Sequence, residues 1–138
     1  MATFNKFNAF AENLAEKVFD LGSDTLKVML TNTAPVAANS VKSDLTEISA
    51  GNGYTAGGEV ATISNSAQTS GTYKLVLADV VFTATGTIGP FRYAVIYDDT
   101  AASDQLIGWW DYASSVSLNN GETFTVDFNA TSGVLTLA

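Results

Sequence analysis

Apolar side chains recur at helical spacing only near the start of the chain. Between residues 5 and 21 they form one stripe, made of Phe7, Phe10, Leu14, Val18 and Leu21. This period predicts an amphipathic helix over residues 5–21, with Asn5 as its N-cap and Gly22 at its C-terminal end. We expect the helix to cover one face or edge of a sheet.

The rest of the chain shows the alternation that is typical of β-strands. A first strand is predicted over residues 25–31, and residues 59–138 form a β-rich core in which strand follows strand. Within 72–85 the apolar parity changes midway, which indicates a bulge or bend near Ala78-Asp79. Asn120-Gly121 is typical of a hairpin turn. The pattern predicts a mainly β fold, an antiparallel β-sandwich or jelly-roll-like domain with one N-terminal amphipathic α-helix, as a single domain over residues 1–138.

Two of the predicted strands, residues 91–97 and 106–112, are apolar on both faces. This pattern is found in central strands and in strands that pack against an oligomeric partner. Trp109 and Trp110 are neighbours in the second strand, so they point to opposite faces and at most one lies in the sandwich core. The other is buried under the helix, lies at an interface, or is exposed as a platform on which a sugar stacks.

Residues 32–58 separate the first strand from the β-rich core and have little periodicity of their own. A loop or arm of this length in a compact domain is usually functional or an interaction loop. Asp44 and Glu47 have the spacing of a capping box, which predicts a short turn of helix. The glycine-rich run around Tyr54 is interpreted as a folded turn or as an arm that packs on a neighbour.

Composition argues against catalysis and against several classes of partner. The 138 residues include no histidine and no cysteine, so the commonest acid–base, nucleophilic and soft-metal groups are missing, and we expect neither enzyme activity nor a cofactor. The net charge of −8 falls on residues 43–138, where Lys74 and Arg92 stand against ten acidic residues. Such a surface repels phosphate backbones, so we expect no nucleic-acid binding. We expect no signal peptide, because the N-terminus has no basic patch followed by an apolar run. We also expect no membrane insertion, because no apolar stretch approaches the ~20 residues that span a bilayer.

The remaining chemistry lies in acidic side chains around one turn, at Asp98, Asp99 and Asp104, with Asp111 beyond it. Carboxylates on a loop can hold calcium, and two facing carboxylates can hydrolyse a glycoside. The interpretation we favour is an aspartate-rich turn whose side chains bond to the local backbone.

Three stretches together resemble a family of small virion structural proteins of tailed bacteriophages. They are MATFNKFNAFAENLAEKVFDLGSDTLKVMLTNTAP, DLTEISAGNGYTAGG and GPFRYAVIYDDTAASDQLIGWWDYASSVSLNNGETFTVDFNATSGVLTLA. They cover nearly the whole chain in order. The resemblance implies a virion component without catalysis, a capsid decoration or cement protein with a sandwich or jelly-roll core.

On this basis we expect a protein made in the cytoplasm of the host bacterium and located on the capsid surface of the virion. Its expected partners are the major capsid protein and further copies of itself. The side chains expected at these contacts are Phe7, Phe10, Tyr54, Trp109 and Trp110. Two alternatives stay open: a tail or head-fibre component that binds host-surface glycans, and a small acid-dependent hydrolase.

Overall fold

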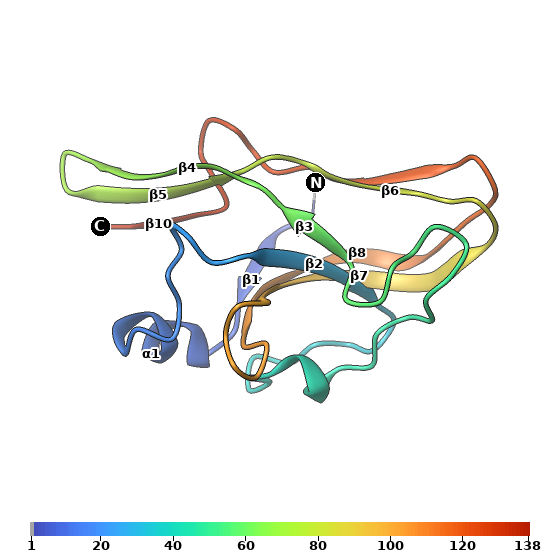
Figure 1. Ribbon diagram of the computed structural model, residues 1–138, viewed down its shortest axis with the longest axis horizontal. Coiled ribbons are helices and arrows are strands. Elements are labelled where there is room, and N and C mark those ends of the chain that lie inside the picture. Colours follow the sequence, from blue (N-terminus) through green and yellow to red (C-terminus); the bar gives the residue numbers. More distant parts are fainter. Residues whose placement is uncertain (1) are drawn as a thin grey trace.

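The computed structural model describes residues 2–138 and shows one short helix among antiparallel strands (Figure 1). The strands are β1 (Phe4–Lys6), β2 (Leu26–Thr31), β3 (Glu59–Ala61), β4 (Ile63–Thr69), β5 (Thr72–Leu77), β6 (Val80–Thr83), β7 (Ile88–Asp98), β8 (Leu106–Leu118), β9 (Thr123–Val126) and β10 (Leu135–Leu137). The helices are α1 (Ala9–Ala15) and a short 3-10 turn, η1 (Lys42–Asp44). The predicted fold class, mainly β and antiparallel with one helix near the N-terminus, is confirmed.

The strands form two facing layers. One layer is a five-stranded sheet in the order β1-β8-β7-β2-β3. The other contains the three-stranded sheet β10-β5-β4 and the pair β6-β9, which lie side by side above the first sheet in Figure 1. Below the five-stranded sheet lie α1, the segment 32–58 and the β7–β8 turn. The molecule therefore has three layers, with the five-stranded sheet in the middle.

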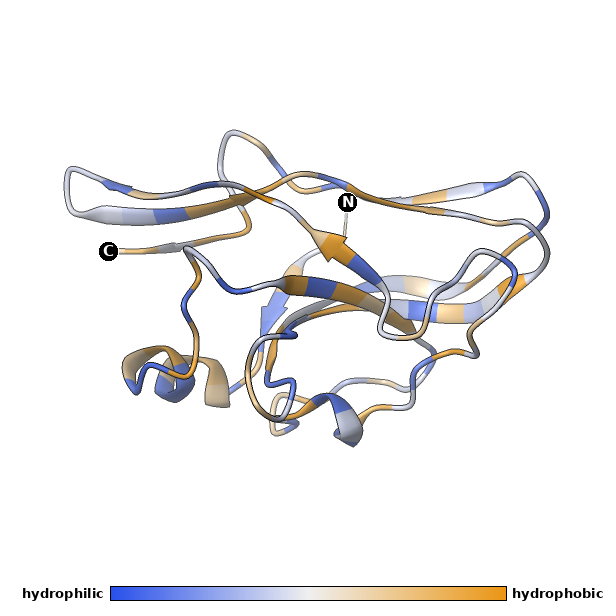
Figure 2. Cartoon of the chain, viewed as in Figure 1, coloured by the Kyte–Doolittle hydropathy of each residue, from blue (hydrophilic) through white to orange (hydrophobic). Residues whose placement is uncertain are grey.

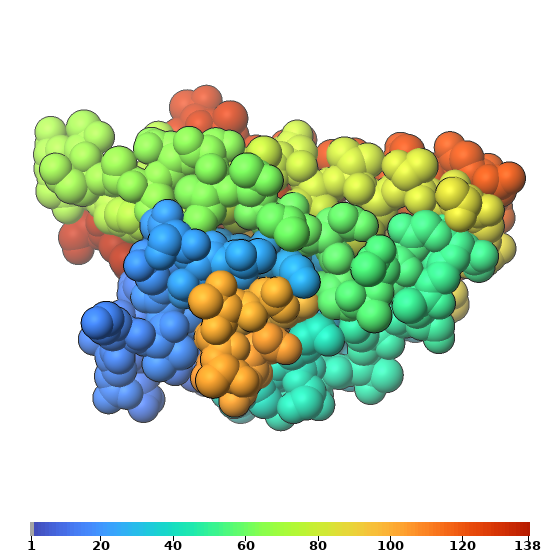
Figure 3. Space-filling view, viewed as in Figure 1, coloured from blue at the N-terminus to red at the C-terminus, as the bar shows by residue number. Residues whose placement is uncertain are grey.

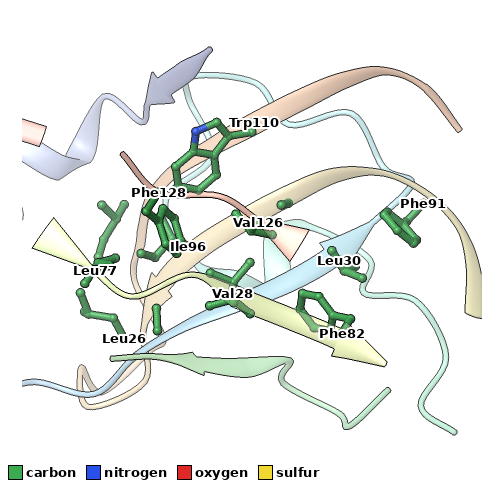
Figure 4. Close-up of a cluster of buried hydrophobic side chains, with 14 of the residues drawn as sticks. Leu26, Val28, Leu30, Leu77, Phe82, Phe91, Ile96, Trp110, Val126 and Phe128 are labelled. Carbon is green, nitrogen blue, oxygen red and sulfur yellow. The ribbon is translucent and has the colours of Figure 1, made fainter. Parts of the chain in front are cut away.

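The main core fills the space between the two sheet layers (Figure 4). Strand β2 contributes Leu26, Val28 and Leu30, the three side chains that its alternation predicts on one face. In Figure 2 this strand is mostly hydrophobic, apart from Lys27, because Met29 on its other face is also buried. From the opposite layer, Phe82 and Val126 point into the same core. The alternation of residues 122–128 predicts that Phe124, Val126 and Phe128 point inward. Val126 and Phe128 are buried in this core, and Phe124 is partly buried beside them.

A second, smaller core lies on the other face of the five-stranded sheet. It contains Phe7, Met29, Leu45, Val95, Tyr97 and Leu106, with Trp109 partly buried against it. Leu45 comes from the 32–58 segment, so this segment covers the second face of the sheet. Strands β7 and β8 are therefore apolar on both faces because the chain's own segments cover both sides of the sheet.

The helix is shorter than its apolar stripe predicts. It spans Ala9–Ala15 only, and Asn8 is its N-cap, without a side-chain capping bond. Asn5 lies in β1, where pairing with Trp109 of β8 takes precedence over capping. Lys17 has a positive φ of 65°, so the helix cannot continue to Gly22. The expected 5–21 helix, its N-cap and its C-cap glycine are thus wrong in their bounds, although a helix is present.

Two connections also differ from their local sequence signals. The break at Ala78-Asp79 is present, but it is a passage from β5 to β6, which belong to different sheets, and not a bulge within one strand. The turn at Asn120-Gly121 forms, with the Glu122 amide donating to the Asn119 carbonyl. It connects β8 with β9 across the two layers, because β8 pairs with β7 and β9 with β6, so the predicted hairpin is absent there.

Candidate functional site

Four of the five side chains expected at contacts with other proteins are buried within the chain. Phe7 and Phe10 lie in the two cores, Tyr54 is 2% exposed and Trp110 7%. Trp109 alone keeps a larger exposed part, and its ring lies 4.5 Å from that of Phe7. The structure does not agree with the expected contact surface at Phe7, Phe10, Tyr54 and Trp110, because intrachain packing already covers these four side chains.

Tyr54 instead joins the main core to a polar site at the edge of β2. Its ring stacks 5.7 Å from the ring of Phe82. Its hydroxyl accepts a hydrogen bond from the Leu30 amide at 3.0 Å and donates one to Glu47 Oε1 at 2.7 Å. Burial and the bond to Glu47 raise the pKa of this phenol well above its ordinary value. Tyr54 therefore stays neutral and serves as a permanent link between β2 and the 32–58 segment.

Glu47 is the centre of this polar site, which we call the Glu47 hub. Besides Tyr54, Oε1 accepts the Gly57 amide at 2.6 Å, and Oε2 pairs with Lys42 Nζ at 3.1 Å. The hydroxyl of Tyr97, in β7, donates to the Gly57 carbonyl. These bonds join the middle of the 32–58 segment to its C-terminal end and tie both to β2 and β7 of the five-stranded sheet. The 32–58 segment therefore packs against the five-stranded sheet along this face.

The expected capping box of this segment is only partly correct. A short helical turn, η1, is present, but Asp44 is its last residue. The Asp44 carboxylate accepts the Ser40 and Val41 amides at 2.8 and 3.2 Å, which holds the pKa of this carboxyl below its ordinary value. Glu47 lies outside the cap, in the hub. Sequence spacing identified both acids but assigned Glu47 the wrong partner.

The aspartate-rich turn after β7 uses its side chains locally, as expected. Asp98 Oδ1 accepts the Thr100 and Ala101 amides at 2.9 and 3.1 Å. Asp99 pairs with Lys27 Nζ at 3.1 Å and donates its amide to the Thr25 carbonyl. These bonds hold the turn against the start of β2.

Asp98 is the most perturbed acidic group in the described chain. It is 0% exposed, and burial together with the neighbouring Asp24 carboxyl raises its pKa to about 7. Its second oxygen, Oδ2, has no donor within reach among residues 2–138. Two carboxyl groups hydrogen-bond to one another only when one of them carries a proton, so burial here favours a protonated Asp98 beside Asp24.

The other acidic candidates are separated from this pair. Asp111 forms a bidentate ion pair with Arg92, at 2.7 and 2.9 Å, which holds the pKa of the Asp111 carboxyl below its ordinary value. Within residues 2–138, no three acidic side chains converge in a way that would hold a metal ion. Of the carboxylates considered for calcium or for glycoside hydrolysis, those of Asp98, Asp99 and Asp111 are thus engaged with backbone amides or with cations, and Asp104 does not converge with them on a metal site.

Several hollows lie on the surface, and two of them are candidate contact sites. An apolar groove of about 600 Å³ lies between residues 14–24, around Val18, and the side formed by β10 and the β4–β5 hairpin. Tyr73 and Leu137 line that second side, and Leu137 is 42% exposed. In Figure 1 this is the end of the molecule where α1 and the C-terminus lie. No sequence signal marked the groove, because its two walls lie more than 40 residues apart in the chain.

The second hollow, of about 490 Å³, lies beside β8 and β9 and is mixed in character. Trp110 and Tyr112 provide its aromatic part, and Asp111 and Asp127 its acidic part. Burial and the charge of Asp127 raise the pKa of Tyr112 to about 12. We call it the aromatic hollow. Trp110 and Asp111 stand out in the sequence, but nothing in its pattern places Asp127 beside them.

None of the described helices has the length and apolar character needed to cross a membrane. Comparisons of the chain with protein-family models, with curated proteins and with solved structures found no match.

Proposed function

We propose that the chain is a structural protein of a tailed-bacteriophage virion, a capsid decoration or cement protein without catalytic activity. The observation that carries the proposal is the use of the buried polar groups. Glu47, Tyr54 and Asp98 all hold loops to the five-stranded sheet, and none of the three lines the apolar groove or the aromatic hollow. Glu47 lines a smaller hollow of about 360 Å³, but both of its carboxylate oxygens are bonded within the chain, to Tyr54, Gly57 and Lys42. The sequence resemblance described above supports the same role.

The apolar groove is the surface that we assign to the capsid. Its occupant on this proposal is the major capsid protein, which would bury Leu137 and the apolar wall of residues 14–21. An exposed concave apolar surface on an acidic protein is typical of a contact site. A protein bound across shell subunits stabilises the assembled shell by mass action, since it binds the assembled state and not the free subunits.

The proposal is tested by counting copies of the chain on purified particles by quantitative mass spectrometry. A number equal to that of the shell protein, or a simple fraction of it, supports the cement function. Leu137→Glu should then lower particle occupancy at least about tenfold, which corresponds to about 1.4 kcal/mol. Val36→Glu is the matched control, because Val36 is 55% exposed and lies outside the groove. Absence of the chain from particles overturns the proposal, and equal losses for both variants overturn the groove assignment.

The aromatic hollow favours the alternative, a tail or head-fibre component that binds glycans. Aromatic faces beside carboxylates suit sugars, whose C–H faces stack on rings while their hydroxyls donate hydrogen bonds. A handful of copies per particle and glycan-array binding that Asp127→Asn weakens would support this second function. Asp104→Asn, on the β7–β8 turn, is the control, and an array without hits counts against the alternative.

A further inference from the structure

Strand β4 has an open edge on the surface of the molecule. It is the outermost strand of the sheet β10-β5-β4 and pairs only with β5. Figure 3 shows the green segment that contains it along the visible surface, with no other part of the chain over it. An open strand edge presents unpaired N–H and C=O groups, which other chains can use to extend the sheet.

The hairpin geometry identifies which backbone groups face this edge. The β4–β5 turn has two residues, Ser70 and Gly71, with φ of 52° and 85°, as in a type I′ hairpin. In such a hairpin the backbone N–H and C=O of Thr69, beside the turn, bond to Thr72 of β5. Because these groups alternate in direction along a strand, the N–H and C=O groups of Ser66 and Gln68 point away from β5.

The opposite side of the hairpin agrees with this assignment. Leu75 is the partner of Ser66, and its carbonyl points away from β4 to accept the Val134 amide at 2.8 Å. The N–H and C=O of Ser66 therefore point to the open edge, and those of Gln68 do the same.

A second copy fits this edge in one antiparallel register. With Ala67 opposite Ala67 of the second copy, Ser66 of each chain faces Gln68 of the other, and four main-chain hydrogen bonds form. The pair is symmetric about Ala67, as a twofold contact requires. Ala67 is exposed, and its methyl group is small enough to face its own copy.

Charge favours this edge for self-pairing. The chain carries a net charge of −8, so most contacts between copies bring acidic groups together. Strand β4 contains no charged residue, whereas the other sheet's edge strands β1 and β3 carry Lys6 and Glu59. Strands β10, β6 and β9 are also uncharged, but they have three, four and four residues, whereas β4 has seven.

We propose that two copies of this chain associate through antiparallel pairing of their β4 edges, forming one continuous six-stranded sheet from the two β10-β5-β4 sheets. The inference deepens the proposed cement function, because it names the surface through which copies associate. Ser66 also lines one side of the apolar groove, so the β4 contact lies beside the surface that we assign to the capsid.

The first test is sedimentation equilibrium of the full chain from micromolar to millimolar concentration. We expect a reversible dimer of the 14.5 kDa chain. Ala67→Glu should weaken it at least about tenfold, because two carboxylates then face each other across the twofold axis. The monomer tolerates this change, since Lys74 lies opposite position 67 within the hairpin. Thr83→Glu adds the same charge at an exposed position of β6 and should leave the dimer intact.

Amide hydrogen exchange locates the contact. Exchange at the Ser66 and Gln68 amides should slow as the protein concentration rises. The Ala67 amide, which bonds to β5 within the hairpin, should show no such dependence. A chain that stays monomeric, a dimer that Ala67→Glu does not weaken, or protection elsewhere overturns the inference. The copy number on particles decides the cement function independently of these results.

Discussion

Replacing Asp98 by asparagine should remove most of the pH dependence of this protein's stability near neutrality. Asp98 is fully buried beside Asp24, and its pKa is raised to about 7. In the Asp98→Asn variant, the side-chain amide oxygen would still accept the two backbone amides of the turn. The NH₂ group of the same side chain would face the Asp24 side chain, so the variant should fold like the wild type.

The size of this pH dependence follows from the difference between the pKa values of Asp98 in the folded and the unfolded chain. In the unfolded chain Asp98 loses its proton near its ordinary pKa of 3.8, but in the folded chain it does so only near about 7. The contribution of this group to stability is therefore fully present below about pH 4, declines as the pH rises, and is lost above about pH 7. A rise from 3.8 to about 7 corresponds to about 4 kcal/mol of unfolding free energy.

Urea unfolding at a series of pH values measures this loss. With a slope of about 2 kcal/mol per molar urea, the wild-type midpoint should fall by up to about 2 M between pH 4 and pH 8 from this group. Asp98→Asn should lack this fall and be the more stable protein at pH 8. Asp99→Asn, which removes a charge from the partly exposed pair with Lys27, should keep the wild-type dependence.

The reasoning is refuted if Asp98→Asn and the wild type show parallel pH profiles between pH 4 and pH 8. A second group would then be responsible for any loss. It is also refuted if carbon-13 NMR shows the Asp98 carboxyl titrating near its ordinary value, because the buried carboxyl would then be stabilised in its charged form.

Three further predictions concern packing and are measured by the same unfolding assay. Gly58→Ala should lower the free energy of unfolding by more than about 4 kcal/mol or prevent folding, because φ is +82° and a Cβ would overlap the Val28 carbonyl oxygen of β2. Gly121→Ala is the matched control: its φ is +88° but the space around it is open, so the loss should be only about 1 kcal/mol. Tyr54→Phe should cost about 1–3 kcal/mol, because a buried backbone amide and a carboxylate both lose the hydroxyl that joins them. Phe82→Ala should cost about 3–5 kcal/mol, whereas Val81→Ala, at a half-exposed site on the same strand, should cost less than about 1 kcal/mol. Equal costs within either matched pair would contradict the packing described here.

The local pattern of the sequence determined the class of structure and the inward face of several strands. Alternation in β2 predicted that Leu26 and Val28 share one face, and both lie in the main core. The parity change at Ala78-Asp79 predicted a break, which is present. These predictions succeeded because a strand's alternation depends only on which of its faces is buried.

Tertiary structure decided what each buried face meets. The apolar stripe of residues 5–21 suited a long helix, but pairing with β8 drew Asn5 into a strand and the helix became shorter. The turn at Asn120-Gly121 suited a hairpin, yet its two strands found partners in different sheets. Long-range strand pairing overrides a local preference because burying the surface of an added strand stabilises the fold by more than a single turn or cap does.

The same distinction applies to the candidate contacts and sites. The sequence identified Tyr54, Trp110 and Asp98 as residues that need an explanation, and each proved to be buried inside the chain. Whether an apolar strand face meets a partner protein or the chain's own 32–58 segment cannot be read from periodicity, since both environments exclude water equally. Asp98 and Asp24 belong to segments more than 70 residues apart, so only the folded chain brings their carboxyl groups together. This proximity, together with burial, raises the pKa of Asp98.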